Sequence, residues 1–412
     1  MKTLESPLMR ELHARGLIHQ CTDGEALDRH LSEGRQVTVY AGFDPTGEGL
    51  HVGHLIALQV LNVFKAHGQT TIALLGGATA QVGDPTGKSA ARPRLDPGTL
   101  TRNRDGVTAD IRRAAPGAVI LDNADWLGSA GLLPFLLEVG AAMPLGHLLS
   151  LETIARRLRD ADATISVLEA FYPLLQGFDF LHLVRNNGPM VQVGGSDQWG
   201  NIATGLELIG KLGPRDVPAW GLTAPLLTKS DGTKMGKTLS GAVWLSPDRL
   251  DDLGLFQFWR NVSDEEAPRF ARIFLPLDKL SGIDRAAGGT AEALNDLKEQ
   301  LAHAATGIAR GTDAADRALA AARAAFGRGG YEDAMPRHAV GTADLRDPAA
   351  MLRKLGLAPS RNDARRLIAQ GGVRIDGKVL VPDAAMDPAC FRQGRVRLSL
   401  GKRRHYLLIL EA

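Results

Sequence analysis

Cysteine is almost absent from this sequence of 412 residues: Cys21 and Cys390 are its only two, near opposite ends of the chain. Because neither belongs to a CxxC pair, the sequence argues against a disulfide framework and a structural zinc site. A long uninterrupted apolar run is also missing, since two prolines, a glutamate and a histidine interrupt the most hydrophobic stretch, 130–151. This argues against a membrane span. The first residues lack the apolar core of a secretory signal, so we expect a cytoplasmic protein.

The chain also lacks a large excess of either charge, because its 48 Lys and Arg nearly balance its 46 Asp and Glu and leave a net charge of +2. The balance is nevertheless uneven along the chain. Residues 341–412 contain 14 basic and 7 acidic side chains, a net charge of +7, so the rest of the chain carries −5. An acidic body with a basic C-terminal module indicates a catalytic part joined to a polyanion-binding part, although a solvated charged surface would give the same counts.

The first half of the chain alternates strands and helices. The β-branched run at 37–43 predicts a strand, the helical spacing of apolar residues at 54–68 predicts a helix, and a second apolar strand follows into a glycine-rich turn at 76–77. The segment 188–198 repeats the pattern of a strand, a glycine turn and a helix. We therefore expect a Rossmann-like parallel sheet with right-handed crossovers, and a ligand site at the carboxyl ends of its strands.

The second half has a different character. Residues 246–335 are rich in amphipathic helical patterns, and 327–348, with glycines, prolines and scattered charges, is interpreted as a linker. The last part predicts a helix and short strands, with a hairpin turn at Asp376 and Gly377. The expected organisation is an α/β domain at 1–245, an α-helical domain at 246–335 and a small α+β domain at 345–412.

Two histidines begin the first predicted helix, in the segment HVGH. His51 and His54 could donate hydrogen bonds to phosphate oxygens at a helix N-terminus, and Gly53 would let a nucleotide base approach the backbone. Histidines three residues apart could equally cap or pack the helix. A zinc site would need a third ligand, and neither an HExxH motif nor a cysteine cluster is present here, so no residue is expected to hold a metal.

Two lysine-bearing segments could face a polyphosphate. The run GDPTGKS at 83–89 is close to a P-loop, but Val82 stands where that motif requires glycine, so a P-loop NTPase is rejected. Lys88 and Arg92 could still bind phosphates there. In KMGKT, Lys234 and Lys237 lie in a loop rich in glycine, serine and threonine, and could neutralise charge in a phosphoryl-transfer transition state, unless this is only a surface loop.

Polar residues also interrupt an apolar helix, FYPLLQGFDF. Tyr172, Gln176 and Asp179 have spacings of four and three, which place them on one helix face among leucines and phenylalanines. Buried groups of this kind need hydrogen-bond partners, which either a ligand hydroxyl or other protein groups would supply.

In this order, the segments resemble a class I aminoacyl-tRNA synthetase. HVGH is similar to the HIGH signature and KMGKT to the KMSKS signature, with Val52, Gly236 and Thr238 as minor departures. YAGFDPT, GGATAQVGDPTGK, QVGGSDQWGN and the helix with Tyr172 are similar to bacterial tyrosyl-tRNA synthetases. RNDARRLIAQGGVRIDGKVL, in turn, resembles the S4-like RNA-binding domain that ends those enzymes.

The resemblance implies a role for each matching residue. The tyrosine hydroxyl would be received by Tyr40 and Asp179. The tyrosine amino and carboxylate groups would be held by Tyr172, Asp84, Gln176 and Gln198, with Thr79 nearby. ATP would be bound by Gly42, Asp44, His51, Gly53, His54, Asp197 and Lys237, with Asp197 on the ribose. The catalytic set, mostly at the leaving pyrophosphate, would be Thr46, His51, His54, Lys88, Arg92, Lys234 and Lys237.

The resemblance also implies partners. ATP and L-tyrosine would be substrates, with Mg²⁺ on the pyrophosphate, and tRNA(Tyr) would accept the tyrosyl group. The domain at 1–245 would be catalytic, 246–335 would bind the anticodon, and 345–412 would bind RNA through Arg361, Arg365 and Arg366 on one predicted helix. A homodimer is implied, with the apolar segment 132–149 as a plausible interface. Tyrosine's own carboxylate would attack the α-phosphorus of ATP, so no protein nucleophile is needed.

Two alternatives remain open at this point. Tryptophanyl-tRNA synthetases share the implied fold, but a phenol that donates and accepts fits Tyr40 and Asp179 better than an indole, which only donates. An S4-type RNA-binding protein without activity would share the basic tail. The intact HVGH motif and the lysines of KMGKT argue against that alternative.

Overall fold

The computed structural model describes residues 4–86, 95–160, 164–228, 230, 232–233, 235–238, 241–326, 337–381, 384–391, 394–401 and 404–411. The chain forms two compact units, Met1–Leu319 and Ala320–Ala412, each described here by itself. Lys88, Arg92 and Lys234 lie outside the described residues, as does the side chain of Lys237. In the part of the chain that is described, no helix is long and apolar enough to cross a membrane.

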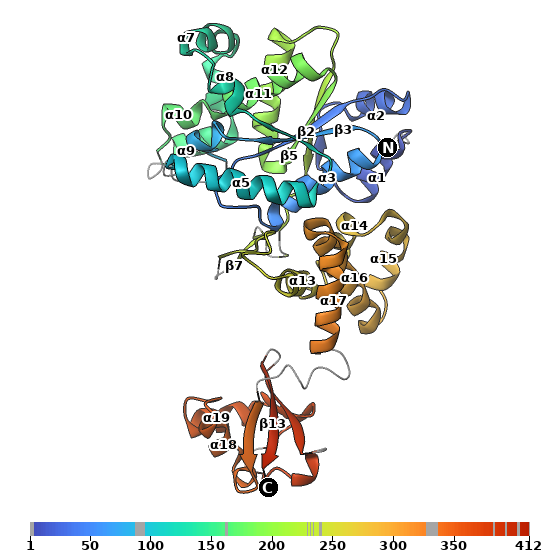
Figure 1. Ribbon diagram of the computed structural model, residues 1–412, viewed down its shortest axis with the longest axis vertical. Helices are drawn as coiled ribbons and strands as arrows, with labels where there is room; N and C mark the ends of the chain where they lie inside the picture. The colour runs from blue at the N-terminus through green and yellow to red at the C-terminus, as the bar shows by residue number, and fades with distance from the viewer. Residues whose placement is uncertain are drawn as a thin grey trace. The chain divides into compact units, whose positions relative to one another are not determined.

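A six-stranded sheet organises the first unit, in the order β1-β6-β5-β2-β3-β4 (Figure 1). The strands are β1 (Gln20–Cys21), β2 (Thr38–Phe43), β3 (Thr70–Leu75), β4 (Val119–Asp122), β5 (Met190–Gly195) and β6 (Ala219–Ala224). All neighbours pair in parallel except β1, which is antiparallel to β6. The predicted Rossmann-like parallel sheet is therefore confirmed.

Helices cover both faces of this sheet. Figure 1 shows α3 (Leu55–Ala66) and α5 (Pro97–Ala114) on one face, with α11 (Tyr172–Asn187) and α12 (Trp199–Leu212) on the other. Gly177 and Gly205 let α11 and α12 pack very closely, because a Cβ added at Gly205 would lie 3.4 Å from the Cα of Gly177. The buried side chains of α11 pack against Tyr40, Ile72 and Leu74 of the central strands.

Short helices complete the α/β part. They are α1 (Pro7–Ala14), α2 (Gly24–Ser32), η1 (Val52–His54), α4 (Thr79–Val82), α6 (Ala124–Leu127), α7 (Leu132–Phe135), the π-helix η2 (Leu136–Gly140), α8 (Leu145–Ser150), α9 (Glu152–Arg159), α10 (Val167–Ala170) and η3 (Ser196–Gln198). After β6 a small hairpin, β7 (Lys237–Thr238) and β8 (Gly241–Ala242), carries part of the KMGKT loop.

The rest of the first unit is helical, as predicted. Its elements are α13 (Asp252–Arg260), α14 (Ala267–Phe274), η4 (Leu277–Lys279), α15 (Leu280–Ala287), α16 (Ala291–Arg310) and α17 (Thr312–Phe326), whose last residues belong to the second unit. Trp259 is fully buried and its ring lies edge-on to Phe270 and Phe274, with centroids 5.8 and 5.1 Å away. This aromatic contact joins α13 to α14.

The second unit contains a five-stranded sheet in the order β11-β10-β12-β13-β9. Its elements are β9 (Arg337–Gly341), η5 (Asp344–Arg346), α18 (Pro348–Lys354), α19 (Arg361–Ala369), β10 (Val373–Ile375), β11 (Lys378–Val379), η6 (Pro388–Cys390), β12 (Arg395–Leu400) and β13 (Arg404–Glu411). The predicted hairpin turn is confirmed, because Asp376 and Gly377 both have positive φ, 46° and 83°.

One expectation about this part was wrong. Residues 337–341 were interpreted as linker, but they form β9, which pairs in parallel with β13 from Leu407↔Arg337 to Glu411↔Gly341. Prolines and glycines nearby hid a five-residue strand whose partner lies about seventy residues further along the chain. The C-terminal sheet therefore begins before residue 345. The separation of 1–245 from 246–335 stays a prediction, since both ranges lie largely in the first unit.

Candidate active site

The predicted site residues of the α/β part gather at the carboxyl ends of the parallel strands. Asp44 follows β2, Thr79 begins α4 after β3, and Gln198 ends η3 after β5. Asp44 follows its strand directly, whereas glycines lie between the apolar parts of β3 and β5 and their polar residues. Parallel strands present such residues at one edge, which is where open α/β sheets bind ligands.

The carboxylate of Asp179 is the centre of a buried hydrogen-bond network. The indole Nε1 of Trp126 donates to Oδ1 at 2.7 Å, and Nδ2 of Asn123 donates to Oδ2 at 2.9 Å. Burial raises the pKa of Asp179 from its ordinary value to about 7, although the bonds from Asn123 and Trp126 act to lower it. Near neutral pH this carboxyl group therefore exists in both protonation states.

Tyr40 points a hydroxyl into the same region from β2. Its side chain is only 1% exposed, and among the described residues its hydroxyl has no hydrogen-bond partner. Burial raises its pKa well above the ordinary value, and the negative charge of Asp179 adds to that effect. A buried hydroxyl without a partner is costly unless a ligand completes it.

A second set of bonds connects Tyr172 to the residue after β2 and, through it, to Thr79 after β3. The Tyr172 hydroxyl donates to Oδ2 of Asp44 at 2.9 Å, and the Thr79 hydroxyl donates to Oδ1 of the same carboxylate at 2.8 Å. Gly76 must be glycine here, because a Cβ at this position would lie 1.8 Å from Oδ1 of Asp44. Burial raises the pKa of Tyr172 well above its ordinary value, and the charges of Asp44, Asp84 and Asp179 add to it. The surroundings of Tyr172 are thus rich in carboxylates, which suits a cationic ligand group.

Side-chain amides form a third group of hydrogen bonds, which includes Asp84. Nε2 of Gln198 donates to Oδ2 of Asp84 at 2.7 Å, and Nε2 of Gln176 donates to Oε1 of Gln198 at 3.3 Å. Asn201 donates to both glutamine oxygens, at 3.0 and 3.2 Å. The structure therefore brings Gln176, Gln198 and Asp84 together, as the resemblance implied.

The two histidines of HVGH form a local cap. The backbone N–H of Gly53 donates to Nδ1 of His51 at 3.1 Å, and the N–H of His51 donates to Nδ1 of His54 at 3.2 Å. Burial, followed by the neighbouring His51, lowers the pKa of His54 to about 3. Because each Nδ1 accepts a bond, each imidazole carries a proton on Nε2. Capping and ligand binding are thus compatible, since Nδ1 serves the backbone and Nε2 is a donor.

For the remaining predicted residues, the structure gives a position and an exposure. Gly42 faces open space, since a Cβ there would meet no atom within 4 Å. Thr46 is exposed in the turn after β2, and Asp197 is half-buried in η3. Among the residues that the structure describes, no group of three His, Cys, Asp or Glu could hold a metal ion.

Comparison with known proteins decides the family. Residues 32–327 match the family model described as tRNA synthetases class I (W and Y), and residues 350–381 match the S4 domain. The chain is 40% identical to the tyrosine–tRNA ligases of Rhodospirillum rubrum and of a Pseudomonas aeruginosa strain, over 99% of this chain and of each relative. This chain belongs to the tyrosyl-tRNA synthetase family.

Solved structures agree with the synthetase fold. A C-terminally truncated mitochondrial tyrosyl-tRNA synthetase from Aspergillus nidulans is 29% identical with a TM-score of 0.67, covering 77% of this chain and 94% of that one. A tryptophanyl-tRNA synthetase from Encephalitozoon cuniculi covers 76% of this chain and 89% of that one with a TM-score of 0.55, but is only 14% identical. That second likeness shows the fold alone.

Sequence reasoning missed three residues of the site of this synthetase. Asn123 and Trp126 bind the carboxylate of Asp179, and Asn201 binds the two glutamines. A usable sign was present for the first two, because DNADW follows the short apolar run AVIL at 118–121. Recognising that run as β4, the neighbour of β3, would have placed both residues at the ligand edge of the sheet.

Proposed function

We propose that this chain activates L-tyrosine with ATP, forming tyrosyl-adenylate and pyrophosphate, and then transfers the tyrosyl group to the 3′-terminal adenosine of tRNA(Tyr) in the cytoplasm. The observation that carries this proposal is two buried polar groups, Tyr40 and Asp179, set among the apolar side chains of β2, β3 and α11. One group is a buried hydroxyl without a partner among the described residues, and the other is a buried carboxyl.

A phenol hydroxyl completes this pair. It can donate its proton to the Asp179 carboxylate and accept from the Tyr40 hydroxyl, which satisfies both groups. The N–H of an indole can only donate, so tryptophan would leave the Tyr40 hydroxyl unpaired. Trp126 already occupies Oδ1 of Asp179 as an indole donor. The site therefore favours tyrosine over tryptophan.

The other substrate groups fit the rest of the cavity. The ammonium group of tyrosine would lie among Tyr172, Gln176 and Asp84, where several carboxylates lower its energy, and its carboxylate would lie near Gln198. That carboxylate attacks the α-phosphorus of ATP and pyrophosphate leaves. Catalysis would rest on orientation and on charge stabilisation by the chain's own donors.

ATP would bind between the HVGH segment and the end of β5. We assign the ATP base and sugar to Gly42, Asp44, Gly53 and Asp197, and the phosphates to Thr46, His51, His54, Lys88, Arg92, Lys234 and Lys237. Nε2 of each histidine would donate to phosphate oxygens, and the buried His54 would do so without adding a net charge. Mg²⁺ would arrive with ATP and neutralise the pyrophosphate, with the nucleotide oxygens as its main ligands.

Charging of tRNA tests the whole proposal. Purified full-length protein, incubated with ATP, magnesium, total bacterial tRNA and one labelled amino acid, is expected to label tRNA with tyrosine and not with tryptophan. Labelling with tryptophan would instead identify a tryptophanyl-tRNA synthetase. No labelling with either amino acid would favour an RNA-binding protein without activity.

Tyrosine affinity is expected to depend on pH through Asp179. A bound phenol donor stabilises the ionised carboxyl, so tyrosine binding lowers a pKa that is about 7 in the free protein. Affinity should therefore be highest above that pKa and should fall by about tenfold from pH 8 to pH 6. Equilibrium dialysis with labelled tyrosine measures this. The Asp179→Asn variant should give a flat profile; an equally steep one would assign the titration to another group.

A homodimer is part of the proposal, because an apolar surface lies on α7, η2 and α8. Leu132, Leu133 and Leu137 of this surface are 73%, 68% and 75% exposed, and Leu145 is 65% exposed. Contiguous exposed leucines in a protein without membrane helices among the described residues favour burial against another chain, here a second copy. Replacing Leu133 and Leu137 with lysine is expected to give monomers in analytical ultracentrifugation.

The basic C-terminal unit is proposed to bind tRNA through its phosphates. Arg361 pairs with Asp347 and Arg366 bonds Asp363 at 2.9 Å, so these two arginines are partly neutralised. The net charge of +7 over 341–412 nevertheless remains. Phosphate-dominated binding weakens steeply with salt, because each neutralised phosphate releases counterions.

Removal of this unit is expected to separate the two activities. Because β9 belongs to the C-terminal sheet, the cut must precede residue 337, and a variant ending at Phe326 removes that sheet completely. It should retain tyrosine-dependent pyrophosphate exchange, lose most tRNA charging and show a smaller salt slope of tRNA binding. A folded variant that charges tRNA normally would overturn the RNA-binding assignment.

A further inference from the structure

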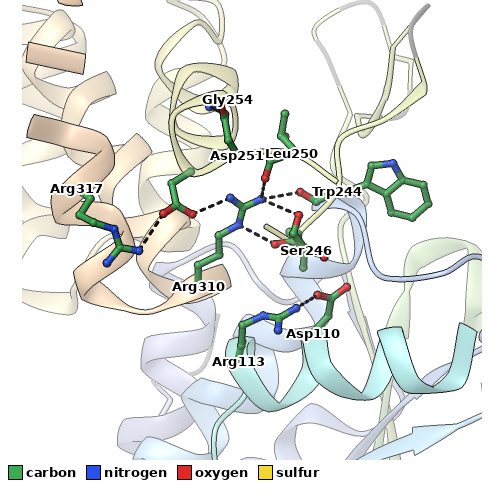
Figure 2. A network of polar contacts seen from close by, with 11 residues as sticks. Asp110, Arg113, Trp244, Ser246, Leu250, Asp251, Gly254, Arg310 and Arg317 are labelled. Carbon is green, nitrogen blue, oxygen red and sulfur yellow. Dashed lines mark hydrogen bonds and ion pairs between the residues drawn. The ribbon is translucent and has the colours of Figure 1, made fainter. Parts of the chain in front are cut away.

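Arg310, the last residue of α16, makes an unusual number of contacts with backbone carbonyls. Its side chain is only 2% exposed. Figure 2 shows its guanidinium surrounded by backbone oxygens from one short segment, and the Asp252 carboxylate accepts from it as well. The contacts are Nε to Leu245 O at 2.7 Å, Nη2 to Leu250 O at 2.6 Å, Ser246 O at 3.2 Å and Trp244 O at 3.4 Å, and Nη1 to Asp252 Oδ1 at 2.9 Å.

These carbonyls all belong to the segment 244–250, which connects the hairpin β7–β8 to α13. A guanidinium holds its donors in a fixed planar fork and keeps its charge inside proteins. It therefore fixes the path of the segment through several acceptors at once, which no neutral or flexible donor could do. Asp252 balances the buried charge.

The other side of the same segment holds the HVGH motif. Leu245 N donates to Leu50 O at 2.8 Å, and Val52 N donates to Val243 O at 2.9 Å. His51 and Trp244 face each other in an isolated antiparallel bridge. Arg310 therefore bonds the backbone of the segment that itself pairs with His51, the residue that we place on the ATP phosphates.

The KMGKT loop is tied to this strand as well. Val243 N donates to Gly236 O at 2.9 Å, next to Lys237. A Cβ added at Gly236 would lie 3.2 Å from Nδ1 of His51 and 3.3 Å from the backbone nitrogen of Gly53. The loop backbone thus packs directly on the HVGH motif, and residues 243–245, at the start of this segment, contact both.

A second buried charge supports the motif from α5. Leu50 N donates to Oδ2 of Asp110 at 2.7 Å, and Arg113 bonds the other oxygen of this fully buried carboxylate (Figure 2). Asp110 thus holds the residue before His51 directly, whereas Arg310 holds the strand that pairs with it. Asp110 belongs to the α/β part, whereas Arg310 belongs to α16 of the helical region.

We propose that Arg310 is a positioning residue for adenylate formation, holding segment 244–250 so that His51 and the KMGKT loop meet the ATP phosphates in the right geometry. The inference rests on the proposed function. Arg310 contacts neither substrate in this account. The tyrosine site is built from β2, β4 and α11, and none of the hydrogen bonds described above for it involves this segment, so tyrosine binding should not require Arg310.

Replacement of Arg310 tests this directly. In Arg310→Ala the rate constant of adenylate formation, measured by rapid quench, is expected to fall by about 10- to 100-fold, the loss that a displacement near 1 Å produces. The dissociation constant of tyrosine should stay within about twofold of wild type, because only orientation at the phosphates is lost. A merely structural role would weaken both quantities together.

Three companion measurements sharpen the result. Arg317→Ala is the matched control, because Arg317 bonds the other oxygen of Asp252 at 3.0 Å but its side chain is 68% exposed; its rate should match wild type. Arg310→Lys keeps the charge without the fork, so it should remain slow. Ethylguanidinium should restore the rate of Arg310→Ala, whereas sodium chloride at equal ionic strength should not.

The outcomes distinguish a failure of the proposed synthetase activity from a failure of the positioning role of Arg310. A wild-type protein without tyrosine-dependent exchange would remove the proposed function itself. An active wild type with an unimpaired Arg310→Ala, or with equal losses in tyrosine affinity and rate, would overturn only the positioning role. If Arg310→Ala fails to fold, Arg310→Lys carries the test, and a normal rate in that variant would contradict the need for the fork.

Discussion

Asp179→Ala is expected to lose most of its affinity for tyrosine. The substitution removes the acceptor for the phenol hydroxyl and also the acceptor that Asn123 and the half-buried Trp126 use. A hydrogen bond to a charged group contributes about 1.5–3 kcal/mol, so tyrosine should bind roughly 10- to 150-fold more weakly. Phenylalanine makes no such bond, and discrimination between the two amino acids should narrow accordingly. Equilibrium dialysis and the KM for tyrosine in pyrophosphate exchange both measure this.

A matched control is available on the same side of the site. Asp125 lies between Asn123 and Trp126 in sequence but is exposed. Asp125→Ala should therefore bind tyrosine like the wild type. Undiminished affinity and selectivity in a folded Asp179→Ala would contradict the assignment of this carboxyl group to the substrate hydroxyl.

Replacing either lysine of the KMGKT loop is expected to slow the chemical step far more than it weakens tyrosine binding. Negative charge moves onto the pyrophosphate only as the bond to the α-phosphorus breaks, so a cation placed there acts mainly in the transition state. By analogy with the removal of one oxyanion-stabilising donor, Lys234→Ala and Lys237→Ala should each cost about 2–4 kcal/mol of activation free energy. Pre-steady-state kinetics separate this rate from the tyrosine dissociation constant.

The exposed Lys65 at the end of α3 provides a control for charge alone. Lys65→Ala should leave both quantities unchanged. If Lys237→Ala instead bound tyrosine more weakly at an unchanged chemical rate, the loop would belong to amino-acid binding and not to the phosphates.

Local sequence patterns predicted the central elements of the fold. The strands β2, β3 and β5 are buried β-branched or apolar runs that end in polar or glycine residues, and α3 and α12 have apolar residues at helical spacing. The same logic placed Tyr172, Gln176 and Asp179 on one face of α11. Such features depend on neighbours within about ten residues, which is why they can be read from the sequence alone.

Elements that depend on distant partners were missed. The short strand β4 is only partly buried, and β9 exists because β13 offers a free edge. Asn123 and Trp126 joined the site only once β4 was placed beside β3. Arg310 has the sequence of an ordinary helix end; only the packing of α16 against a loop some sixty residues earlier buries its guanidinium. Periodicity contains no information about such contacts.

The exchange of labelled pyrophosphate into ATP, with single amino acids added to the purified full-length protein, tests the central claim most directly. It requires only adenylate formation and needs neither tRNA nor a dissected chain. We predict exchange that depends on tyrosine and that tryptophan and phenylalanine do not support at the same concentration. Exchange supported by tryptophan in preference to tyrosine, or no exchange with any amino acid, would contradict the account.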